Sequence, residues 1–314
     1  MLVFGIYAKI LMSSPLATDE KKKGHLKMKE AKKRLRWLAI VIATVAVLTM
    51  MAIPSSAANH STVPIYLDGE EIVSGSALLI DSVTYVPLRA FCDESASATY
   101  SGEFKIHWDA SKFSAVVEGK GLYLIATQGK CYITVNGRVF YTVGDILNID
   151  GRIFVPVRPM AKALGLELEW DSAKRAVSLT STGERTKTAD EVYNQDDLYW
   201  LSRIISAEAG GEIFRGKLAV GNVVLNRVRS PQYPNTIWGV IFDRKHGTQF
   251  TPAVTGTIYK TPNAESVLAA KACLEGYSLS DNILFFLNPR IATNFWIVNT
   301  RSFAFTIGNH DFYS

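Results

Sequence analysis

The chain has 314 residues, 48% of them hydrophobic, and a net charge of +5, so it is long and apolar enough for two folded domains. Much of the positive charge lies before residue 37, and no basic stripe with interleaved aromatic residues follows, which argues against nucleic-acid binding. Three cysteines without CxxC spacing and five scattered histidines argue against a disulfide framework or a zinc site, and no cofactor is expected.

Residues 1–58 are predicted to contain a secretory signal peptide. A basic cluster at 27–36 precedes an apolar run at 37–53, and small residues up to Ala58 form a cleavage site. An apolar run of about 17 residues is also the lower limit of a membrane span, so a retained membrane anchor is the less favoured alternative. A basic region normally opens a signal peptide, and we therefore hypothesise that the natural start is Met28. The protein is then secreted, and the signal peptide is its contact with the membrane.

Residues 62–180 contain an internal repeat. Three motifs recur: an Asp/Asn-Gly turn at 68–69 and 136–137, Val-Pro-Leu/Val-Arg at 86–89 and 155–158, and Trp-Asp at 108–109 and 170–171. Each copy reads as strand, turn, strand, short helix, strand, Trp-Asp turn and strand. The sequence therefore predicts a duplicated β-rich module.

This duplicated pattern resembles the copper amine oxidase N-terminal-like domain, a module at the front of many secreted bacterial proteins. Despite that name, a copper site lacks ligands, because His107 is the single histidine of the two copies. Trp108 and Trp170 suit stacking on sugar rings, but aromatic residues at a repeated turn also serve packing. Contact with the cell wall or a protein partner through 62–180 and a plain spacer role therefore both remain open.

Residues 181–195 are polar and predict a linker, so a second domain is expected at 196–314. Helical periodicity and capping residues there predict four helices and one strand. The expected helices run from Leu198 to a stop at Gly210-Gly211, over 214–229, over 237–242 behind a cap at Asn235 or Thr236, and from the cap Asn263 to Glu275; the strand covers 283–287.

The first of these helices carries a carboxylate in an unusual position. Leu201, Ile204 and Ile205 form an apolar stripe, and continuing that stripe by three or four residues reaches Glu208. A glutamate on the buried face of a helix end is partly desolvated, so its pKa is expected to rise. A carboxyl group with a raised pKa suits a general acid near neutral pH. The alternative is that the helix ends there and Glu208 turns to solvent.

Several motifs of the second domain resemble the SleB family of cell-wall hydrolases, which includes spore-cortex-lytic enzymes active in germination. They appear in the family's order: 207–212, 223–228, 233–237, 240–242, 249–251 and 285–289. The resemblance implies a mainly helical, lysozyme-like α+β catalytic domain. It also implies that Glu208, the first glutamate of a Glu-Ala-x-Gly-Glu motif, protonates the bond between N-acetylmuramic acid and N-acetylglucosamine in peptidoglycan glycan strands.

Glycosidases normally need a second carboxylate, and Glu212 is the candidate, although a capping or ion-paired role is as plausible. A single glutamate suits a lytic transglycosylase, in which the muramic 6-hydroxyl attacks, and this reading is favoured over hydrolysis. Gln249, Phe250 and Thr251 are expected in a substrate-binding loop, where Phe250 could instead belong to the core. Asn288 is expected after its strand, where it could instead cap a turn.

Two other functions remain as alternatives. A zinc-dependent N-acetylmuramoyl amidase would need about three ligands, and His246, His310 and one glutamate lack the usual spacing. A wall-binding protein without catalytic activity is the second, and the presence of Glu208 argues against it. The overall reading is a secreted multidomain protein of the cell wall or spore envelope, with a duplicated β-rich module ahead of a helical catalytic domain.

Overall fold

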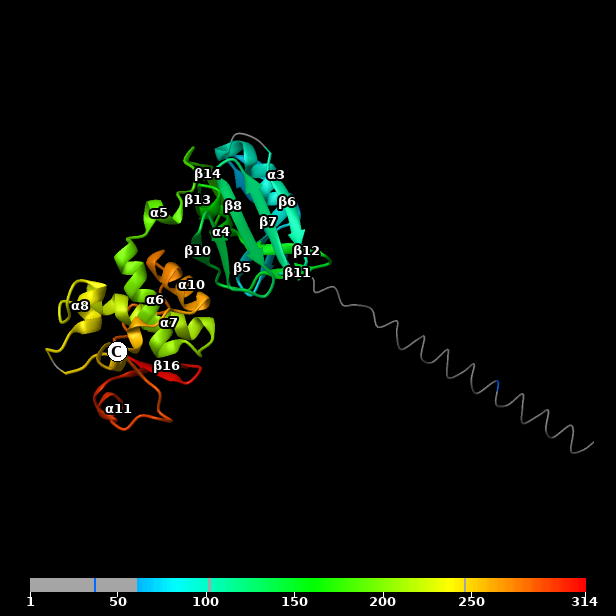
Figure 1. Ribbon diagram of the computed structural model, residues 1–314. Helices are drawn as coiled ribbons and strands as arrows, with labels where there is room; N and C mark the ends of the chain where they lie inside the picture. Colours follow the sequence, from blue (N-terminus) through cyan, green and yellow to red (C-terminus); the bar gives the residue numbers. More distant parts are fainter. Residues whose placement is uncertain (1–36, 38–60, 101–102, 246) are drawn as a thin grey trace, which may run out of the picture. The chain divides into compact units, whose positions relative to one another are not determined.

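The computed structural model describes Trp37 and residues 61–100, 103–245 and 247–314 (Figure 1). The chain divides into two units, Met1–Asn59 and a compact unit, His60–Ser314. Apart from Trp37, the predicted signal peptide lies outside the described residues, as do Met28 and the candidate metal ligand His246. Within the described part of the chain, no helix is both long and apolar enough to cross a lipid bilayer.

Three sheets form the β-rich part of the compact unit. Their strand orders are β1-β4-β5-β12-β11, β10-β9-β8-β7-β6 and β13-β14-β2-β3. Helix α3 (Leu88–Thr99) follows β5, and helix α4 (Val157–Ala163) follows β12. The strands are β1 Ser61–Thr62, β2 Ile65–Leu67, β3 Glu70–Ile72, β4 Leu78–Ile80, β5 Val83–Pro87, β6 Lys105–Asp109, β7 Ser114–Gly119, β8 Leu122–Thr127, β9 Tyr132–Val135, β10 Arg138–Tyr141, β11 Leu147–Ile149, β12 Arg152–Pro156, β13 Leu166–Asp171 and β14 Ala176–Ser181.

The predicted Asp/Asn-Gly turns are present. Asp68-Gly69 joins β2 to β3 and Asn136-Gly137 joins β9 to β10, with φ values of 50° and 94° in the first pair and 50° and 79° in the second. Two successive positive φ values are those of the tight turn that matches the twist of a hairpin. Glycine adopts such a value without steric cost, and Asp and Asn tolerate it.

The two segments that carry the repeated motifs share their sheets. Strands β5 and β12 pair antiparallel, with Val86 opposite Val155. The last strand of the second segment, β14, pairs with β2 at the start of the first, and β8 connects β7 to β9. One hydrophobic cluster runs through both segments and includes Ile65, Phe91 and Leu164, all fully buried. Strands of each segment therefore complete sheets begun by the other.

The segment 181–195, predicted to be a polar linker, is packed at several points. The buried Thr186 hydroxyl donates to the carbonyl of Ala163 at 2.9 Å. Helix α5 (Ala189–Val192) follows, and the buried Tyr193 hydroxyl donates to Glu275 at 2.8 Å. The composition of the segment indicates its polarity, but it does not reveal these partners, which lie 23 and 82 residues away.

Three long helices form the centre of the C-terminal part: α6 (Gln195–Ala209), α7 (Phe214–Arg229) and α10 (Ala264–Leu274). Their apolar faces bury one cluster that includes Ile204, Leu218 and Ala269. The predicted caps Thr236 and Asn263 accept backbone hydrogen bonds from Gly239 and Ser266. The remaining elements are α8 Ile237–Phe242, α9 Thr251–Thr255, η1 Thr257–Tyr259, α11 Trp296–Thr300 and a sheet of order β15-β17-β16, with β15 Phe285–Leu287, β16 Phe303–Ile307 and β17 His310–Tyr313.

Candidate active site

Glu208 lies in the last turn of α6, where the apolar stripe predicts it. Leu201, Ile204 and Ile205 on the same helix are fully buried, and Glu208 is partly buried. Burial raises the pKa of Glu208 to about 7, while Arg227 acts in the opposite direction. The side chain makes no hydrogen bond with any residue that the structure describes. The expected combination of a desolvated carboxyl group and a raised pKa is therefore present.

The helix ends directly after this carboxylate. Gly210 is the C-cap, with a right-handed φ of −58°, so the stop does not depend on the left-handed conformation that glycine often supplies at a helix end. The side-chain amide of Asn263 donates to the carbonyl of Gly210 at 3.1 Å. A Cβ atom at position 210 would come within 3.3 Å of that amide nitrogen. The glycine therefore leaves room for Asn263, the N-cap of α10, to hydrogen-bond to the end of α6.

Arg227 is the charged neighbour of Glu208, and sequence reasoning did not assign it a role in the site. Its guanidinium carbon lies 5.1 Å from the ring centroids of Tyr233 and Phe250, and 5.5 Å from that of Phe285. Its Nε atom donates to the carbonyl of Leu284 at 2.8 Å. Burial lowers the pKa of Arg227, and Tyr233, Asp243 and Glu208 oppose that effect. Arginine keeps its charge in such surroundings, so the site contains a permanent cation.

A signal for Arg227 is present in the sequence. Val220, Val223 and Val224 of α7 are fully buried, and the next position of the same stripe is Arg227. Arg227 on α7 therefore resembles Glu208 on α6, because each is a charged residue at a position where the helical pattern predicts an apolar residue.

The predicted substrate loop contacts this arginine. The side-chain carbonyl of Gln249 accepts a hydrogen bond from Arg227 at 3.3 Å. Phe250 is 2% exposed and belongs to the hydrophobic cluster, so its ring serves the core, the second of the two roles considered. Thr251 is exposed and begins α9. Gln249 is partly exposed and Thr251 exposed, whereas Phe250 is buried beside Arg227, and substrate contact by Gln249 and Thr251 stays a prediction.

Asn288 forms a turn after β15. Its side-chain oxygen accepts from the backbone nitrogen of Arg290 at 3.0 Å, and its carbonyl accepts from Ile291 and Ala292. Asn288 therefore caps the turn after β15, which is the alternative role considered for it. Substrate contact by Asn288 stays a prediction.

Glu212 holds the C-terminal hairpin. Its two carboxylate oxygens accept from the backbone and side-chain nitrogens of Asn309, at 3.1 and 2.9 Å. Burial by itself raises the pKa of Glu212, but the bonds from Asn309 outweigh that effect and the pKa lies below its usual value. The carboxylate also lies 3.9 Å from His310. Glu212 is therefore ionised and hydrogen-bonded to the turn between β16 and β17.

His310, a candidate zinc ligand in the amidase alternative, is buried, and so is the cysteine Cys273. His310 is 7% exposed and has no hydrogen-bond partner for Nδ1 among the described residues, and burial lowers its pKa. Cys273 is 1% exposed, and burial raises its pKa to about 12, so the thiol is protonated at neutral pH. Among the residues that the structure describes, no group of three or more His, Cys, Asp and Glu side chains is placed to hold a metal ion.

The arrangement supports proton transfer. Near neutral pH a carboxyl group with a pKa of about 7 is present in both protonation states, so Glu208 can donate a proton and accept one back. Arg227 stabilises the carboxylate that remains after donation, because the two groups are electrostatically coupled. The neighbouring Glu212 carboxylate is engaged with Asn309.

Comparison with known proteins identifies relatives of both parts of the chain. Residues 211–313 match the family described as Cell Wall Hydrolase, and residues 66–179 and 135–195 match the Copper amine oxidase N-terminal domain. The spore cortex-lytic enzyme of Bacillus cereus is 28% identical over 257 residues, which are 76% of this chain and 93% of that protein. That of Oceanobacillus iheyensis is 37% identical over 120 residues, 38% of this chain and 42% of that protein.

A solved structure is also similar to this chain: the catalytic domain of the germination-specific lytic transglycosylase SleB from Bacillus anthracis. It is 36% identical, and the match covers 39% of this chain and 97% of that domain with a TM-score of 0.36. The two family matches confirm both resemblances predicted from sequence motifs. The cell wall hydrolase match begins at Gly211, so the case for Glu208 depends on its own burial and charge environment.

Proposed function

Because residues 211–313 form a domain of the cell wall hydrolase family, we propose that this protein degrades peptidoglycan by cutting the bond between N-acetylmuramic acid and N-acetylglucosamine. The single observation that carries this assignment is Glu208: a carboxyl group with a pKa of about 7 at the end of a buried helix face. Protonated Glu208 gives its proton to the glycosidic oxygen, the bond from that oxygen to the muramic C1 breaks, and positive charge develops on the muramic ring.

We propose that the second step is an internal attack. The Glu208 carboxylate takes the proton from the 6-hydroxyl of the same muramic residue, O6 bonds to C1, and a 1,6-anhydro sugar leaves. No water is consumed, and Glu208 ends the cycle protonated. This reading is supported by the position of Glu212, whose oxygens both accept hydrogen bonds from Asn309 and are not free to activate water.

The substrate proposed is spore cortex peptidoglycan. The support is that the Bacillus cereus relative, of which this chain covers 93%, is a spore cortex-lytic enzyme. We further propose that the signal peptide predicted in residues 1–58 directs secretion, which places the protein in the cell wall or spore envelope. The β-rich residues 62–180 are proposed to be a duplicated module that contacts the wall.

Product analysis tests the reaction. Purified peptidoglycan is digested with the protein and the fragments are identified by mass spectrometry. The transglycosylase predicts 1,6-anhydro-muropeptides, whereas reducing muramic ends would indicate hydrolysis and free stem peptides an amidase. Glu208→Gln should lower the rate by at least about 100-fold. Glu212→Gln serves as the control, because an amide oxygen can still accept a hydrogen bond from Asn309; if that variant is equally inactive, the single-acid mechanism is wrong.

A further inference from the structure

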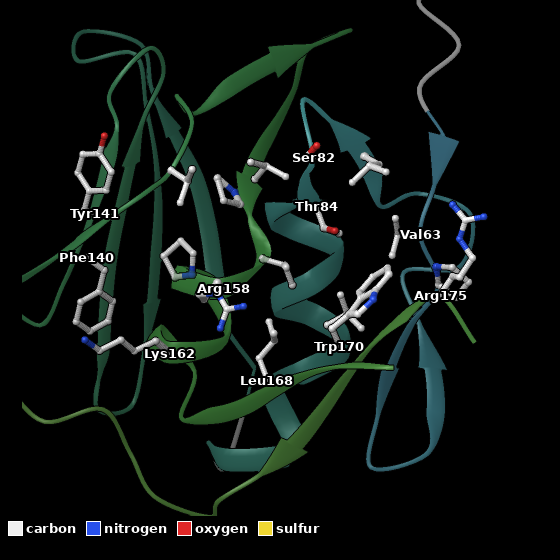
Figure 2. Close-up of a pocket in the computed structure, with 18 of the residues that line it drawn as sticks. Val63, Ser82, Thr84, Phe140, Tyr141, Arg158, Lys162, Leu168, Trp170 and Arg175 are labelled. Carbon is white, nitrogen blue, oxygen red and sulfur yellow. The ribbon is translucent and has the colours of Figure 1, made fainter. Parts of the chain in front are cut away.

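Two cavities have volumes of about 640 and 850 Å³; the first is lined by the β-rich part, and the second by the β-rich part together with Glu275, Gly276 and Tyr277. We name each by its tryptophan. The Trp108 groove is lined by residues that include Arg89, Ile106, Trp108, Phe113, Arg152 and Ile153. The Trp170 groove is lined by residues that include Thr84, Arg158, Lys162, Leu168, Trp170 and Arg175, and Figure 2 shows these side chains around one opening.

The grooves are made from matching positions of the two repeated segments. The equivalent pairs are Arg89 and Arg158, Ile106 and Leu168, Trp108 and Trp170, and Phe113 and Arg175. Each groove is completed by a turn of the opposite segment, residues 151–153 beside Trp108 and residues 82–84 beside Trp170. The antiparallel pairing of β5 with β12 produces this exchange, because it places each segment's turn beside the helix start of the other.

The tryptophans lie near the ends of β6 and β13, and other side chains hydrogen-bond within the turns that follow. The side chain of Asp109 accepts from the backbone nitrogens of Ser111 and Lys112, and Asp171 accepts in the same way from Ala173 and Lys174. These bonds hold the turns. Trp108 is 43% exposed and Trp170 is 51% exposed, so neither ring is buried in the core. An indole that is half exposed beside a cavity has an open face for a ligand.

Both grooves carry a surplus of positive charge. The residues lining the Trp108 groove include Arg89 and Arg152 and no acidic residue. Those lining the Trp170 groove include Arg158, Lys162, Lys174 and Arg175 and one acid, Glu275, whose carboxylate is bound by Arg138 at 2.6 Å and Lys162 at 2.8 Å. Within the described residues, Arg152, Arg158 and Arg175 form no ion pair, so their charges face whatever enters the grooves.

We propose that the two grooves are equivalent binding sites for a carboxylate-bearing polysaccharide, with a sugar ring stacked on each tryptophan and its carboxylates bound by the neighbouring arginines. The identification of that polymer as the glycan strand of peptidoglycan, with its lactyl and peptide carboxylates, rests on the proposed function. Indole faces favour the apolar side of a pyranose, and guanidinium groups bind carboxylates through two parallel hydrogen bonds.

Two sites of the same kind on a module with one shared hydrophobic core suit a repeating polymer. Once one groove is occupied, the second meets the same strand, or a neighbouring one, at a high effective concentration. Retention on an insoluble wall then depends on both tryptophans together. Binding through the grooves keeps the catalytic domain close to its substrate even when the catalytic domain itself is not bound.

The test uses the full chain without its signal peptide in a Glu208→Gln background, so that bound glycan is not cut. Binding to insoluble peptidoglycan is measured by co-sedimentation, and binding to soluble glycan strands by calorimetry. Trp108→Ala and Trp170→Ala should each weaken binding about 3- to 10-fold, and the double variant should lose more than either. Tyr123→Ala is the matched control, because Tyr123 is 48% exposed on β8 of the same module and lines neither groove.

A second pair of variants tests the charge. Arg152→Gln and Arg158→Gln replace exposed side chains that form no ion pair among the described residues, so folding is retained even if a tryptophan variant is unstable. Both should weaken binding, and glycan whose carboxylates have been converted to amides should bind the unaltered protein as weakly. Equal binding by all variants overturns the proposal, as does preference for a phosphate polymer or nucleic acid over glycan. If the protein with Glu208 intact binds glycan in this way but releases no fragments from it, the proposed function is refuted and this proposal stands.

Discussion

Glu208 and Arg227 occupy corresponding positions on two helices. Each continues a stripe of fully buried apolar residues, and each is a charged group at the last turn of its helix. Burial disfavours the charged form of both groups, and their mutual attraction favours it. The result is a carboxyl group that stays protonated up to about pH 7 beside a cation that never loses its charge.

The pH dependence of activity follows from the pKa of Glu208. The group acts first as an acid, so it must be protonated when substrate binds. Its pKa of about 7 predicts that kcat/KM falls as the pH rises through 7, by about tenfold for each further unit. Initial rates on soluble glycan between pH 5 and 9 measure this; a rate that stays constant up to pH 9 would contradict the assignment.

The charge of Arg227 should set the pH at which kcat/KM begins to fall, the alkaline limb of the rate profile. Arg227→Met removes the group that favours ionised Glu208, so the alkaline limb of the rate profile should move to higher pH. Arg229→Met is the control, since Arg229 lies on the same helix and is exposed. A lower rate with an unmoved limb would mean that Arg227 serves packing alone.

Stability should change with pH at the same residue. A carboxyl group whose pKa rises from 4.5 to about 7 on folding binds more protons in the folded state than in the unfolded state. The free energy of unfolding is therefore highest at low pH and falls as the pH rises from 4.5 to 7. Glu208→Gln removes this cost. The variant should therefore be more stable than the parent at pH 8, by on the order of 1–3 kcal/mol, and nearly equal at pH 4, as measured by urea unfolding.

At the scale of elements, Glu275 joins parts of the chain that are distant in sequence. Its carboxylate accepts from Arg138 of β10 at 2.7 and 2.6 Å, from Lys162 of α4 at 2.8 Å and from Tyr193 at 2.8 Å. Burial raises the pKa of this carboxyl group, but the three donors outweigh burial and the pKa lies below its usual value. The β-rich and helical parts therefore meet at the buried Glu275 carboxylate, whose charge is compensated by these donors.

Breaking this cluster should destabilise the whole compact unit. Glu275→Ala leaves Arg138 without its partner in a site where the arginine is 12% exposed, and loss of one member of a buried pair costs about 3–5 kcal/mol. Arg185→Ala is the control, because its pair with Glu191 is solvent-exposed and should contribute little, and the hydrogen bond from Thr188 to Glu191 is kept. Thermal unfolding of both variants gives the comparison, and similar melting temperatures would refute the role of Glu275.

At the scale of the molecule, the β-rich and helical parts share a hydrophobic boundary. Tyr141 and Tyr277 stack with ring centroids 3.7 Å apart, Tyr132 lies 4.8 Å from Phe214, and the buried Val139 belongs to the helical cluster. The division into 62–180 and 196–314 with a linker between them stays a prediction. In the structure, residues 60–314 form one compact unit.

Removing the β-rich part should therefore weaken the catalytic part. A fragment of residues 196–314 exposes Phe214 and Tyr277 and leaves Glu275 without Arg138 and Lys162. Its melting temperature should be several degrees lower than that of residues 60–314, because about 1 kcal/mol shifts the midpoint by several degrees in a domain of this size. Equal midpoints by calorimetry would show that the two parts fold independently.

The sequence alone determined those features that depend on neighbouring residues. The stripe leading to Glu208, the Asp/Asn-Gly turns at 68–69 and 136–137, and the caps Thr236 and Asn263 are all present, because helix periodicity, positive φ values and capping act within a few residues. The matching Trp-Asp motifs are also present, and the structure places each tryptophan beside a groove.

Only the tertiary structure decided which distant groups meet. It gave Glu212 a partner 97 residues away in Asn309, placed Phe250 in the core beside Arg227, and packed Tyr193 of the expected linker against Glu275. It also paired β5 with β12 and β14 with β2, so that the two segments that carry the repeated motifs share sheets. The physical reason is that strand edges and buried charges pair with the partners that the whole fold brings within hydrogen-bonding distance. The local sequence pattern around a residue does not specify which distant residue becomes its partner.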